Sequence, residues 1–546
     1  MFAHSQRMMI DCVKPQSWSI TVNTEASIAG SKKSAVPFNL SNIDNLKVEV
    51  DWGDGTSSNL SKNDYTVSDS TASVHEYASP GIYTITIKSR QWNKLPFMSL
   101  LNAIIITPDK INDAIEPLYW WQTTLTSVNT AIPFNEGKLR RYNSATSTSY
   151  LSDSSNNVDG VFEYCSKLSQ IPSDLFSKNT TITSFWYCFK GCSSLQSIPA
   201  GLFDNNTQTI SFNNCFTSCS SLQSIPEGLF DNNTAATSFS ETFSYCSSLQ
   251  SIPAGLFDNN INATYFSYCF AGTAITAIPG DLFKYNVNAT NFSDCFAGCS
   301  FLQAIPSGLF AYNVNATSFT WCFSSCKSIT SIPSNLFRNN VNAQYFSRCF
   351  SGTSITTVSV DLFKYNTLAK EFSATFLGCS ELVSIPADLF RYNTAVTTFS
   401  NCFYTCTKLE QIPTTLFKYN TAVTSFAGTF FSCDSIAAIP EGLFDYNVNV
   451  TSFDTCFNHC DSLRTIPQNL FLYNTKVTNF SWCFRALNFL NAAVRITSTD
   501  VTIVNEFISY RVSPSSASYT VYVPANSTTE ATFAAAALPT VTVISE

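Results

Sequence analysis

A short motif that recurs every 27 residues, and every 26 residues in two places, constrains the fold of this chain more than any other feature. One unit reads L-x-x-I-P-x-x-L-F-x-x-N, continues for about five residues, and ends with F-x-x-C-F-x-x-C. The Ile-Pro pairs begin at Ile171, Ile198, Ile225, Ile252, Ile278, Ile305, Ile332, Ile385, Ile412, Ile439 and Ile466, and Val358-Ser359 fills the remaining slot. A single unit cannot bury its apolar face, whereas stacked units share a continuous core. The repeat therefore predicts a solenoid of twelve rungs over residues 161–487.

The columns of each unit predict how one rung folds. Phe, Cys, Phe and Cys at relative positions 0, 3, 4 and 7 mark one face of a helical turn, so we expect these side chains to point inward. The L-x-x-I segment predicts a short strand, which Pro ends because it lacks an N–H. The Asn of L-F-x-x-N recurs from Asn179 to Asn474, and its amide can satisfy the backbone of a recurring turn.

The twenty Cys residues raise the question of disulfides or a zinc site. Ten begin a C-x-x-L-type pattern, nine precede a Phe, and Cys12 lies outside the repeats. Thr replaces Cys in five units, at Thr242, Thr273, Thr353, Thr375 and Thr429. A small packing position tolerates this exchange, whereas a metal site with four converging ligands does not. We therefore predict buried free thiols, with a few disulfides or a metal as the alternatives, and no cofactor.

Two columns that vary between units are predicted to face solvent. Position 2 of the F-x-x-C-F-x-x-C segment lies opposite the inward face, and its aromatic members are Tyr187, Tyr268, Trp321 and Trp482. The second column precedes the recurring Asn and changes along the chain from an acidic, Asn-rich edge to a basic, Tyr-rich edge. Its candidate binding residues are Tyr285, Tyr312, Tyr365, Tyr392, Tyr419, Tyr446 and Tyr473, with Lys364, Arg391 and Lys418 as neighbouring cations. Exposed Tyr beside cations suits stacking on sugars or docking an acidic partner; a structural ridge of packed rings is the alternative.

Residues 47–87 carry a different pattern. A strand runs into W-G-D-G at residues 52–55, and H-E-Y at residues 75–77 precedes a Pro-Gly turn and an alternating strand. Both motifs resemble those of polycystic-kidney-disease (PKD) domains. The resemblance implies an immunoglobulin-like β-sandwich in residues 1–92 that serves as a spacer or contact module. Asp51 and Asp54 could bind Ca²⁺, although carboxylates that cap the backbone N–H groups of a turn are the simpler interpretation.

The repeats resemble the BspA-like leucine-rich repeats of bacterial surface proteins. Phe239, Phe243, Cys246, Leu249 and Ile252 match the F-x-x-x-F-x-x-C-x-x-L-x-x-I variant of that family. The resemblance implies a leucine-rich-repeat solenoid and adhesins among its relatives. It also implies that the phrase Y-V-P-A-N-S-T near the end is a last strand followed by a short helix at residues 530–538. Because terminal repeats need a different outer face, residues 93–160 are predicted to be a connector and N-terminal cap, and residues 488–546 a C-terminal cap.

Composition and the absence of certain sequence motifs argue against several classes of function. A net charge of −8, with 12% charged residues, argues against a nucleic-acid partner. Three His residues and the lack of a catalytic triad, paired-carboxylate motif, phosphate loop or H-E-x-x-H motif predict a non-enzymatic protein. No apolar stretch approaches the ~18 residues of a membrane span, so no membrane insertion is expected, and the first residues lack the apolar core of a signal peptide.

These observations favour an attachment or structural protein on the exterior of a phage virion, because virion proteins leave the cell by lysis and fold where thiols stay reduced. Modules that resemble PKD and BspA domains also occur together in proteins of gut anaerobes and their phages. The expected partners are a host-surface glycan or protein, or other virion proteins. Further copies of the same chain, in a homo-oligomer, are another possible partner. The alternatives are a BspA-like adhesin at the bacterial cell surface or secreted from it, and an architectural spacer without a ligand.

Overall fold

The computed structural model describes most of the repeat region and parts of both ends. The described residues are 16–23, 33–35, 47–61, 74–76, 78–79, 82–89, 125–128, 160–487, 491–510, 518–536 and 541–546. The chain forms two compact units, Met1–Ala263 and Thr264–Glu546, and each is described by itself. Cys12 and Tyr77, which the sequence patterns singled out, lie outside the described residues.

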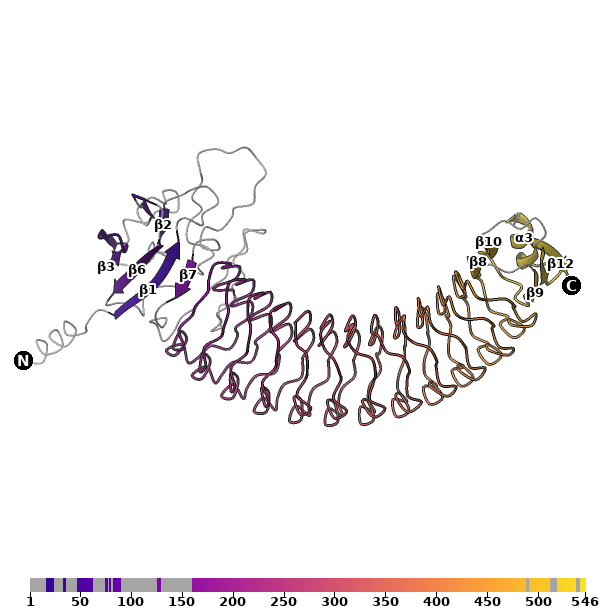
Figure 1. The fold of residues 1–546 in the computed structure, drawn as a ribbon, viewed down its shortest axis with the longest axis horizontal. Coiled ribbons are helices and arrows are strands. Elements are labelled where there is room, and N and C mark those ends of the chain that lie inside the picture. The colour runs from indigo at the N-terminus through magenta and orange to yellow at the C-terminus, as the bar shows by residue number, and fades with distance from the viewer. Residues whose placement is uncertain are drawn as a thin grey trace, which may run out of the picture. The chain divides into compact units, whose positions relative to one another are not determined.

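The N-terminal part of the first unit consists of β-strands (Figure 1). They are β1 (Gln16–Asn23), β2 (Lys33–Ala35), β3 (Lys47–Asp51), β4 (Ser57–Ser61), β5 (Val74–Glu76), β6 (Ile82–Ser89) and β7 (Leu125–Val128). Five of them form an antiparallel sheet in the order β4-β3-β6-β1-β7, and β2 pairs with β5. Strand β7 lies inside the predicted connector at residues 93–160, yet it pairs with β1. An edge strand leaves its outer backbone N–H and C=O groups unpaired, and β7 pairs with those of β1.

The carboxylates of Asp51 and Asp54 form hydrogen bonds within the W-G-D-G turn. Asp51 Oδ1 accepts a hydrogen bond from the N–H of Gly53 at 3.0 Å, and Asp54 Oδ1 accepts one from the N–H of Thr56 at 3.0 Å. Trp52 is buried and donates its indole N–H to Ser58 Oγ at 2.9 Å. The carboxylates therefore cap the turn, as the simpler of the two sequence interpretations predicts.

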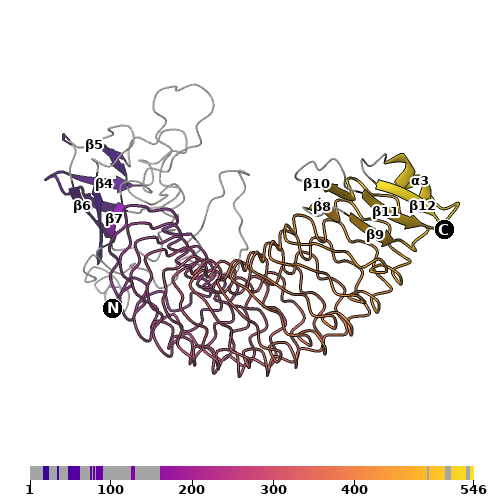
Figure 2. The ribbon, with the colours of Figure 1, turned by 45° about the vertical axis from the view of Figure 1, so that its right-hand side comes forward.

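Consecutive repeats lie side by side in each unit and are joined by parallel bridges (Figures 1 and 2). In the first unit Ser211 bridges both Ser184 and Ser238. In the second unit the same column, which directly precedes the Phe at position 0, continues from Tyr265 to Asn479. The predicted L-x-x-I strand is reduced to isolated bridges such as that between Ser197 and Ser224. Bridges thus recur in more repeats at the residue before Phe than in the L-x-x-I segment, where the sequence pattern predicts the strand.

The helical turn predicted for each repeat is wrong, although the inward face is right. Phe185, Cys188, Phe189 and Cys192 are all buried. Cys188 donates its N–H to the carbonyl of Phe185, three residues back, at 3.1 Å, as in a β-turn. The N–H groups of Phe185 and Phe189 instead donate to carbonyls of the next repeat, and position 2, here Tyr187, has a left-handed φ of 59°. Bonds to the neighbouring repeat thus replace those that would continue a helix.

Phe side chains fill the core in stacked columns. Phe212 stacks on Phe185 at a centroid distance of 5.5 Å, and Phe216 stacks on Phe189 at 5.3 Å. The Phe of each Leu-Phe pair, such as Phe203, contacts the first of these columns at about 5 Å with tilted rings. Offset and tilted arrangements are the favoured geometries for aromatic pairs. The apolar core is therefore continuous from one repeat to the next.

The recurring Asn occupies the place that the sequence predicts. Asn393, which is fully buried, donates its amide to the carbonyls of Phe363 at 3.0 Å and of Asn366 at 2.9 Å in the preceding repeat. The same pair of bonds recurs at Asn206, Asn233, Asn260, Asn313, Asn340, Asn366, Asn420, Asn447 and Asn474. The side-chain amides therefore form a ladder that joins successive repeats.

The C-terminal part of the second unit covers the last repeat. Its elements are β8 (Phe484–Leu487), β9 (Asn491–Arg495), β10 (Ile508–Tyr510), β11 (Ser518–Val523), α3 (Thr528–Ala535) and β12 (Val541–Ser545). The N–H groups of Phe480 and Phe484 donate to the carbonyls of Ile503 and Phe507, so this segment supplies the acceptors that another repeat would supply.

The helix of this cap begins earlier than predicted, at Thr528 rather than Glu530. Ser527 caps it by accepting the N–H of Glu530, whose carboxylate reaches back to the N–H of Asn526 at 2.7 Å. This pair resembles a capping box, except that Glu530 accepts the N–H of Asn526 rather than that of the N-cap Ser527. In the described part of the chain, no helix combines the length and the hydropathy that crossing a bilayer requires.

Candidate ligand-binding surfaces

The tyrosine ridge comprises Tyr285, Tyr312, Tyr365, Tyr392, Tyr419, Tyr446 and Tyr473, all in the second unit. Each follows a Leu-Phe pair by two residues and precedes the buried Asn. Asn393 donates its N–H to the carbonyl of Phe390 at 3.1 Å, which closes a turn with Arg391 and Tyr392 at its centre. Because the Phe and the Asn are buried at either end, the two central side chains project outward. The sequence pattern thus places a pair of exposed or half-buried side chains at the surface of every repeat.

Most rings of the ridge are exposed, and five of the seven lie near a cation. Six of the seven are 38–52% exposed, and Tyr419 is half-buried. The guanidinium of Arg391 lies 5.8 Å from the ring centroid of Tyr392 and 5.1 Å from that of Tyr419 in the next repeat. Lys418 lies in the same way between Tyr419, at 5.7 Å, and Tyr446, at 5.5 Å. The structure therefore brings these predicted residues together as an alternating row of rings and cations.

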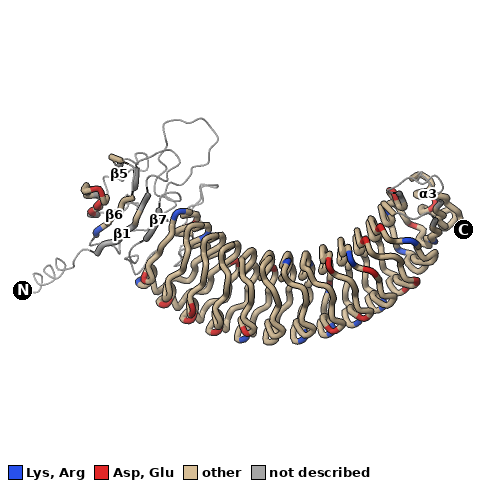
Figure 3. The backbone as a smooth tube through the Cα atoms, viewed as in Figure 1, with Lys and Arg blue, Asp and Glu red and all other residues tan. Residues whose placement is uncertain are grey.

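The charge of this edge differs from the basic edge that the sequence predicts. Lys364 forms an ion pair with Asp361 at 3.1 Å, and Arg391 forms one with Asp388 at 3.4 Å. Each acidic partner stands three residues before its cation, where the turn brings the two side chains together. Charged residues of both signs therefore recur along the lower margin of the repeats in the view of Figure 3. The edge is closer to neutral than a count of Lys and Arg predicts.

The turn row is the position-2 column, whose aromatic members are Tyr187, Tyr268, Trp321 and Trp482. All four residues have left-handed backbones with φ of 53–59°. Cations contact three of the rings: Lys190 lies 4.2 Å from Tyr187, Arg348 lies 4.4 Å from Trp321, and Arg485 lies 5.6 Å from Trp482. Tyr187 belongs to the first unit and the other three to the second. The prediction that this column faces outward holds for its aromatic members in the second unit, which are 36–39% exposed.

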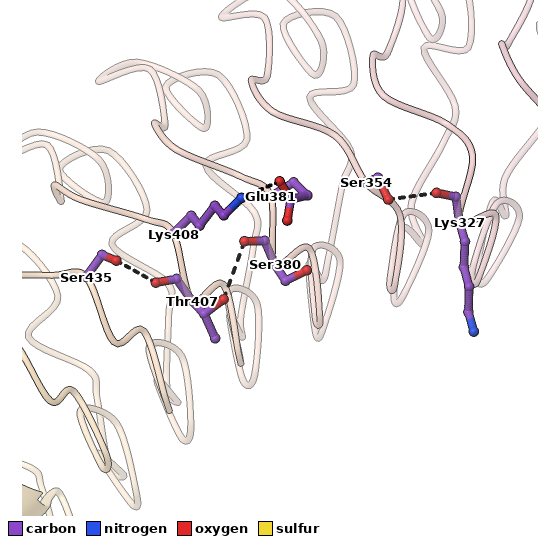
Figure 4. Close-up of polar contacts among 7 residues, drawn as sticks. All are labelled: Lys327, Ser354, Ser380, Glu381, Thr407, Lys408 and Ser435. Carbon is purple, nitrogen blue, oxygen red and sulfur yellow. Dashed lines mark hydrogen bonds and ion pairs between the residues drawn. The ribbon is translucent and has the colours of Figure 1, made fainter.

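Sequence reasoning missed a column of hydroxyl groups at the surface. Ser354 Oγ donates to the carbonyl of Lys327 at 2.7 Å, and Ser435 Oγ donates to that of Thr407 at 2.7 Å (Figure 4). Beside them Lys408 forms an ion pair with Glu381 of the preceding repeat at 2.6 Å. Ser or Thr follows seven of the ten C-x-x-L-type Cys residues, and this recurrence was a usable indication, because the hydroxyl lies one residue from a buried column. These bonds join successive repeats.

The described cysteines form buried thiols. Cys406 Sγ donates to the carbonyl of Phe376 in the preceding repeat at 3.2 Å, and equivalent bonds recur along the column. At position 3, Thr429 replaces the Cys of other repeats, and its Oγ1 donates to the carbonyl of Phe399 in the preceding repeat at 3.1 Å. Burial raises the pKa of the thiols well above the usual value. Protonated thiols are poor nucleophiles and poor metal ligands, so this column serves packing and hydrogen bonding.

Among known proteins, only solved structures show a similarity to this chain. No family model matches the chain, and no curated protein matches it. The chain is similar to the Toll–Spatzle complex of Drosophila (16% identity, TM-score 0.29, 65% of this chain and 52% of that one). It is also similar to a leucine rich cell surface protein of Faecalibacterium prausnitzii (17% identity, TM-score 0.27, 59% of this chain and 78% of that one). A TDR receptor is similar with 16% identity and a TM-score of 0.39, over 71% of this chain and 65% of that one. The chain spans about half the length of the Toll structure. All three TM-scores lie below 0.5, and the hydrogen bonds and parallel bridges between successive repeats show the repeat fold.

Proposed function

We propose that this chain is a non-enzymatic repeat protein that binds a ligand on an exterior surface through the tyrosine ridge. The observation that carries the proposal is the alternation of exposed Tyr rings with cations over consecutive repeats. A flat ring with a polar hydroxyl and an adjacent cation can stack on a sugar and hydrogen-bond its hydroxyl groups. The ligand we propose is a host-surface glycan or protein.

The setting we propose is the exterior of a phage virion, as a fibre, decoration or receptor-binding component. In this proposal a PKD-like domain in residues 1–92 acts as a spacer, residues 93–160 connect it, and BspA-like repeats form a twelve-rung solenoid at residues 161–487 with a cap at residues 488–546. A BspA-like adhesin at the bacterial cell surface is the second candidate, because that resemblance covers the same repeats. A spacer without a ligand, contacting only other virion proteins or further copies of the chain, is the third.

The ridge proposal is tested with the triple variant Tyr392→Ala/Tyr419→Ala/Tyr446→Ala. We expect attachment to host cells or to immobilised glycans to be lost, because each stacked ring contributes about 0.5–1.5 kcal/mol to such contacts. We expect the melting temperature to change little, because exposed rings lose little on truncation. A matched control is Tyr245→Ala/Tyr345→Ala, which removes exposed rings outside the ridge and should keep attachment.

The two alternatives give different results with the same protein. If the ridge is structural, the triple variant melts at a lower temperature and the still-folded protein binds as before, which contradicts the proposal. Mass spectrometry of purified phage particles and of the bacterial cell envelope distinguishes the virion component from the cellular adhesin. A chain recovered only from the cell envelope would contradict the virion setting while leaving the ridge proposal intact.

A further inference from the structure

Three successive members of the turn row differ from the rest of that row. Tyr268, Asp294 and Trp321 occupy position 2 of consecutive repeats, with φ of 55°, 57° and 57°. Because their backbones are alike, their side chains leave the repeats in the same direction. The flanking Phe rings at position 0 set the spacing: Phe266 and Phe292 lie 5.7 Å apart, and Phe292 and Phe319 lie 5.8 Å apart. A carboxylate therefore lies between two aromatic side chains.

The carboxylate of Asp294 is buried without a cation. The residue is 8% exposed and accepts a hydrogen bond from the hydroxyl of Tyr268. Among residues 160–487 it forms no ion pair with Lys, Arg or His. Burying a negative charge is unfavourable unless a positive charge or several hydrogen bonds compensate it. A cation that arrives from outside would supply what the chain does not.

The surface beside these residues is built of small side chains. Positions 5 and 6 are Ala271 and Gly272 in the first of these repeats, and Ala297 and Gly298 in the second. A Cβ added to Gly298 would meet only the backbone of Gly272, at 3.6 Å. Other repeats carry large residues there, including Tyr404 and Phe431, which stack at 4.3 Å. The positions beside Asp294 thus carry only small side chains: Ala271 is buried, and Gly272, Ala297 and Gly298 are half-buried.

The Trp321 ring is already placed to attract cations. The guanidinium of Arg348, from the following repeat, lies 4.4 Å from its centroid. The ring is 36% exposed, and Asp294 belongs to the repeat on its other side. Aromatic faces combined with a carboxylate are the elements with which proteins bind organic ammonium groups.

We propose that Tyr268, Asp294 and Trp321 form a binding site for an alkylammonium group. The carboxylate provides the charge, the two rings provide faces for the carbon-bound hydrogens, and the half-buried Ala297 and Gly298 place no large side chain beside the carboxylate. A divalent metal ion fits less well, because Ca²⁺ and Mg²⁺ require several oxygen ligands and the site offers one carboxylate. The proposal is independent of the tyrosine ridge, since it shares no residue with it.

Fluorine NMR of the full chain labelled with 5-fluorotryptophan tests the site. The probes are tetramethylammonium chloride, the free small ion, and N-acetyl-lysine amide, which represents a lysine of a partner protein; sodium chloride at equal ionic strength is the blank. We expect the resonance of Trp321, assigned with Trp321→Phe, to shift in a saturable way with at least one of the probes. A response to tetramethylammonium alone indicates a quaternary ammonium ligand, and a response to the lysine probe indicates a protein side chain.

Trp482 is an internal control, because it also has an arginine near its ring but has Thr455 one repeat earlier instead of an acid. Its resonance should not shift. Asp294→Asn should weaken binding at Trp321 about tenfold or more, which corresponds to about 1.4 kcal/mol. Asp454→Asn, which removes a half-buried charge elsewhere, should leave binding unchanged.

Three outcomes would overturn the proposal: no saturable shift at Trp321 with either probe, an equal shift in the Asp294→Asn protein, or an equal shift with a neutral sugar such as glucose. The last would identify a carbohydrate site instead. The melting temperature of each variant shows whether it is folded. If Asp294→Asn fails to fold, Tyr268→Phe with the same titration replaces it, and unchanged binding in both Tyr268→Phe and Trp321→Tyr would contradict the site.

Discussion

The recurring Asn shows what a single residue contributes when it is repeated. Its amide donates to two backbone carbonyls of the preceding repeat, as Asn393 does to Phe363 and Asn366. The sequence predicts this column because a polar residue that recurs inside an apolar repeat needs a recurring partner. It does not predict which carbonyls accept, since those depend on how neighbouring repeats stack. The burial of Asp294 escaped prediction for the same reason, because its column also holds exposed residues.

Asn393→Ala should lower the free energy of unfolding by about 1–3 kcal/mol, because it removes two hydrogen bonds inside the core and leaves a small cavity. Urea-induced unfolding followed by circular dichroism measures the change. Asn342→Ala is the matched control: its amide donates to the Val314 carbonyl at 3.0 Å, but the residue is exposed. We expect less than about 0.5 kcal/mol for the control. Equal losses in the two variants would show that burial does not strengthen the Asn ladder.

Asp294 should make stability depend on pH. Burial raises its pKa from 3.8 to about 6, and the hydrogen bond from Tyr268 opposes this shift only in part. A carboxyl whose pKa is higher in the folded state stabilises the fold when protonated, so its contribution is complete below about pH 4 and is lost as pH rises through 6. Asp294→Asn should therefore be more stable than the parent by about 1–3 kcal/mol at pH 8 and about equal to it at pH 4. Melting temperatures of both proteins across this range test the sign.

At the scale of the element, the F-x-x-C-F-x-x-C segment shows how one burial pattern fits two backbones. Positions 0, 3, 4 and 7 face inward in a helix, and they face inward in the turns observed here. The sequence therefore predicts the buried columns correctly and the backbone incorrectly. The deciding interactions are hydrogen bonds such as that from Phe189 to Cys215 in the next repeat, and periodicity within a single segment contains no information about them.

Position 6 of this segment tests the cost of its left-handed turn. Gly378 has φ of 72°, and a Cβ there would contact Gly352 at 3.7 Å, which leaves room for a side chain. Backbone conformation should therefore decide the outcome. Gly378→Val should destabilise the protein by about 1–3 kcal/mol, whereas Gly378→Asn should cost less than about 1 kcal/mol, because Asn tolerates this region. Thermal unfolding of the two variants measures the difference, and similar losses would mean that space limits this position after all.

At the scale of the molecule, the described repeats protect their cysteines collectively. The cysteines of residues 160–487 are buried as free thiols, and burial raises their pKa. We expect slow reaction of the native protein with a thiol reagent at pH 8, and rapid reaction of most of the twenty after unfolding without a reductant. Eight or more disulfides found by mass spectrometry would contradict the thiol assignment and indicate folding in an oxidising compartment.

The bonds between repeats also bear on how such a chain can change over generations. The Asn ladder, the Phe columns and the turn N–H groups each join one repeat to its immediate neighbour, at sequence separations of 26 to 30 residues. A recombination event that removes or duplicates one whole period leaves every remaining junction chemically the same. The number of repeats can therefore change one at a time without any change in the residues of the core. The two 26-residue steps show that a junction accommodates the loss of one residue; a larger shift within a repeat would misalign these columns.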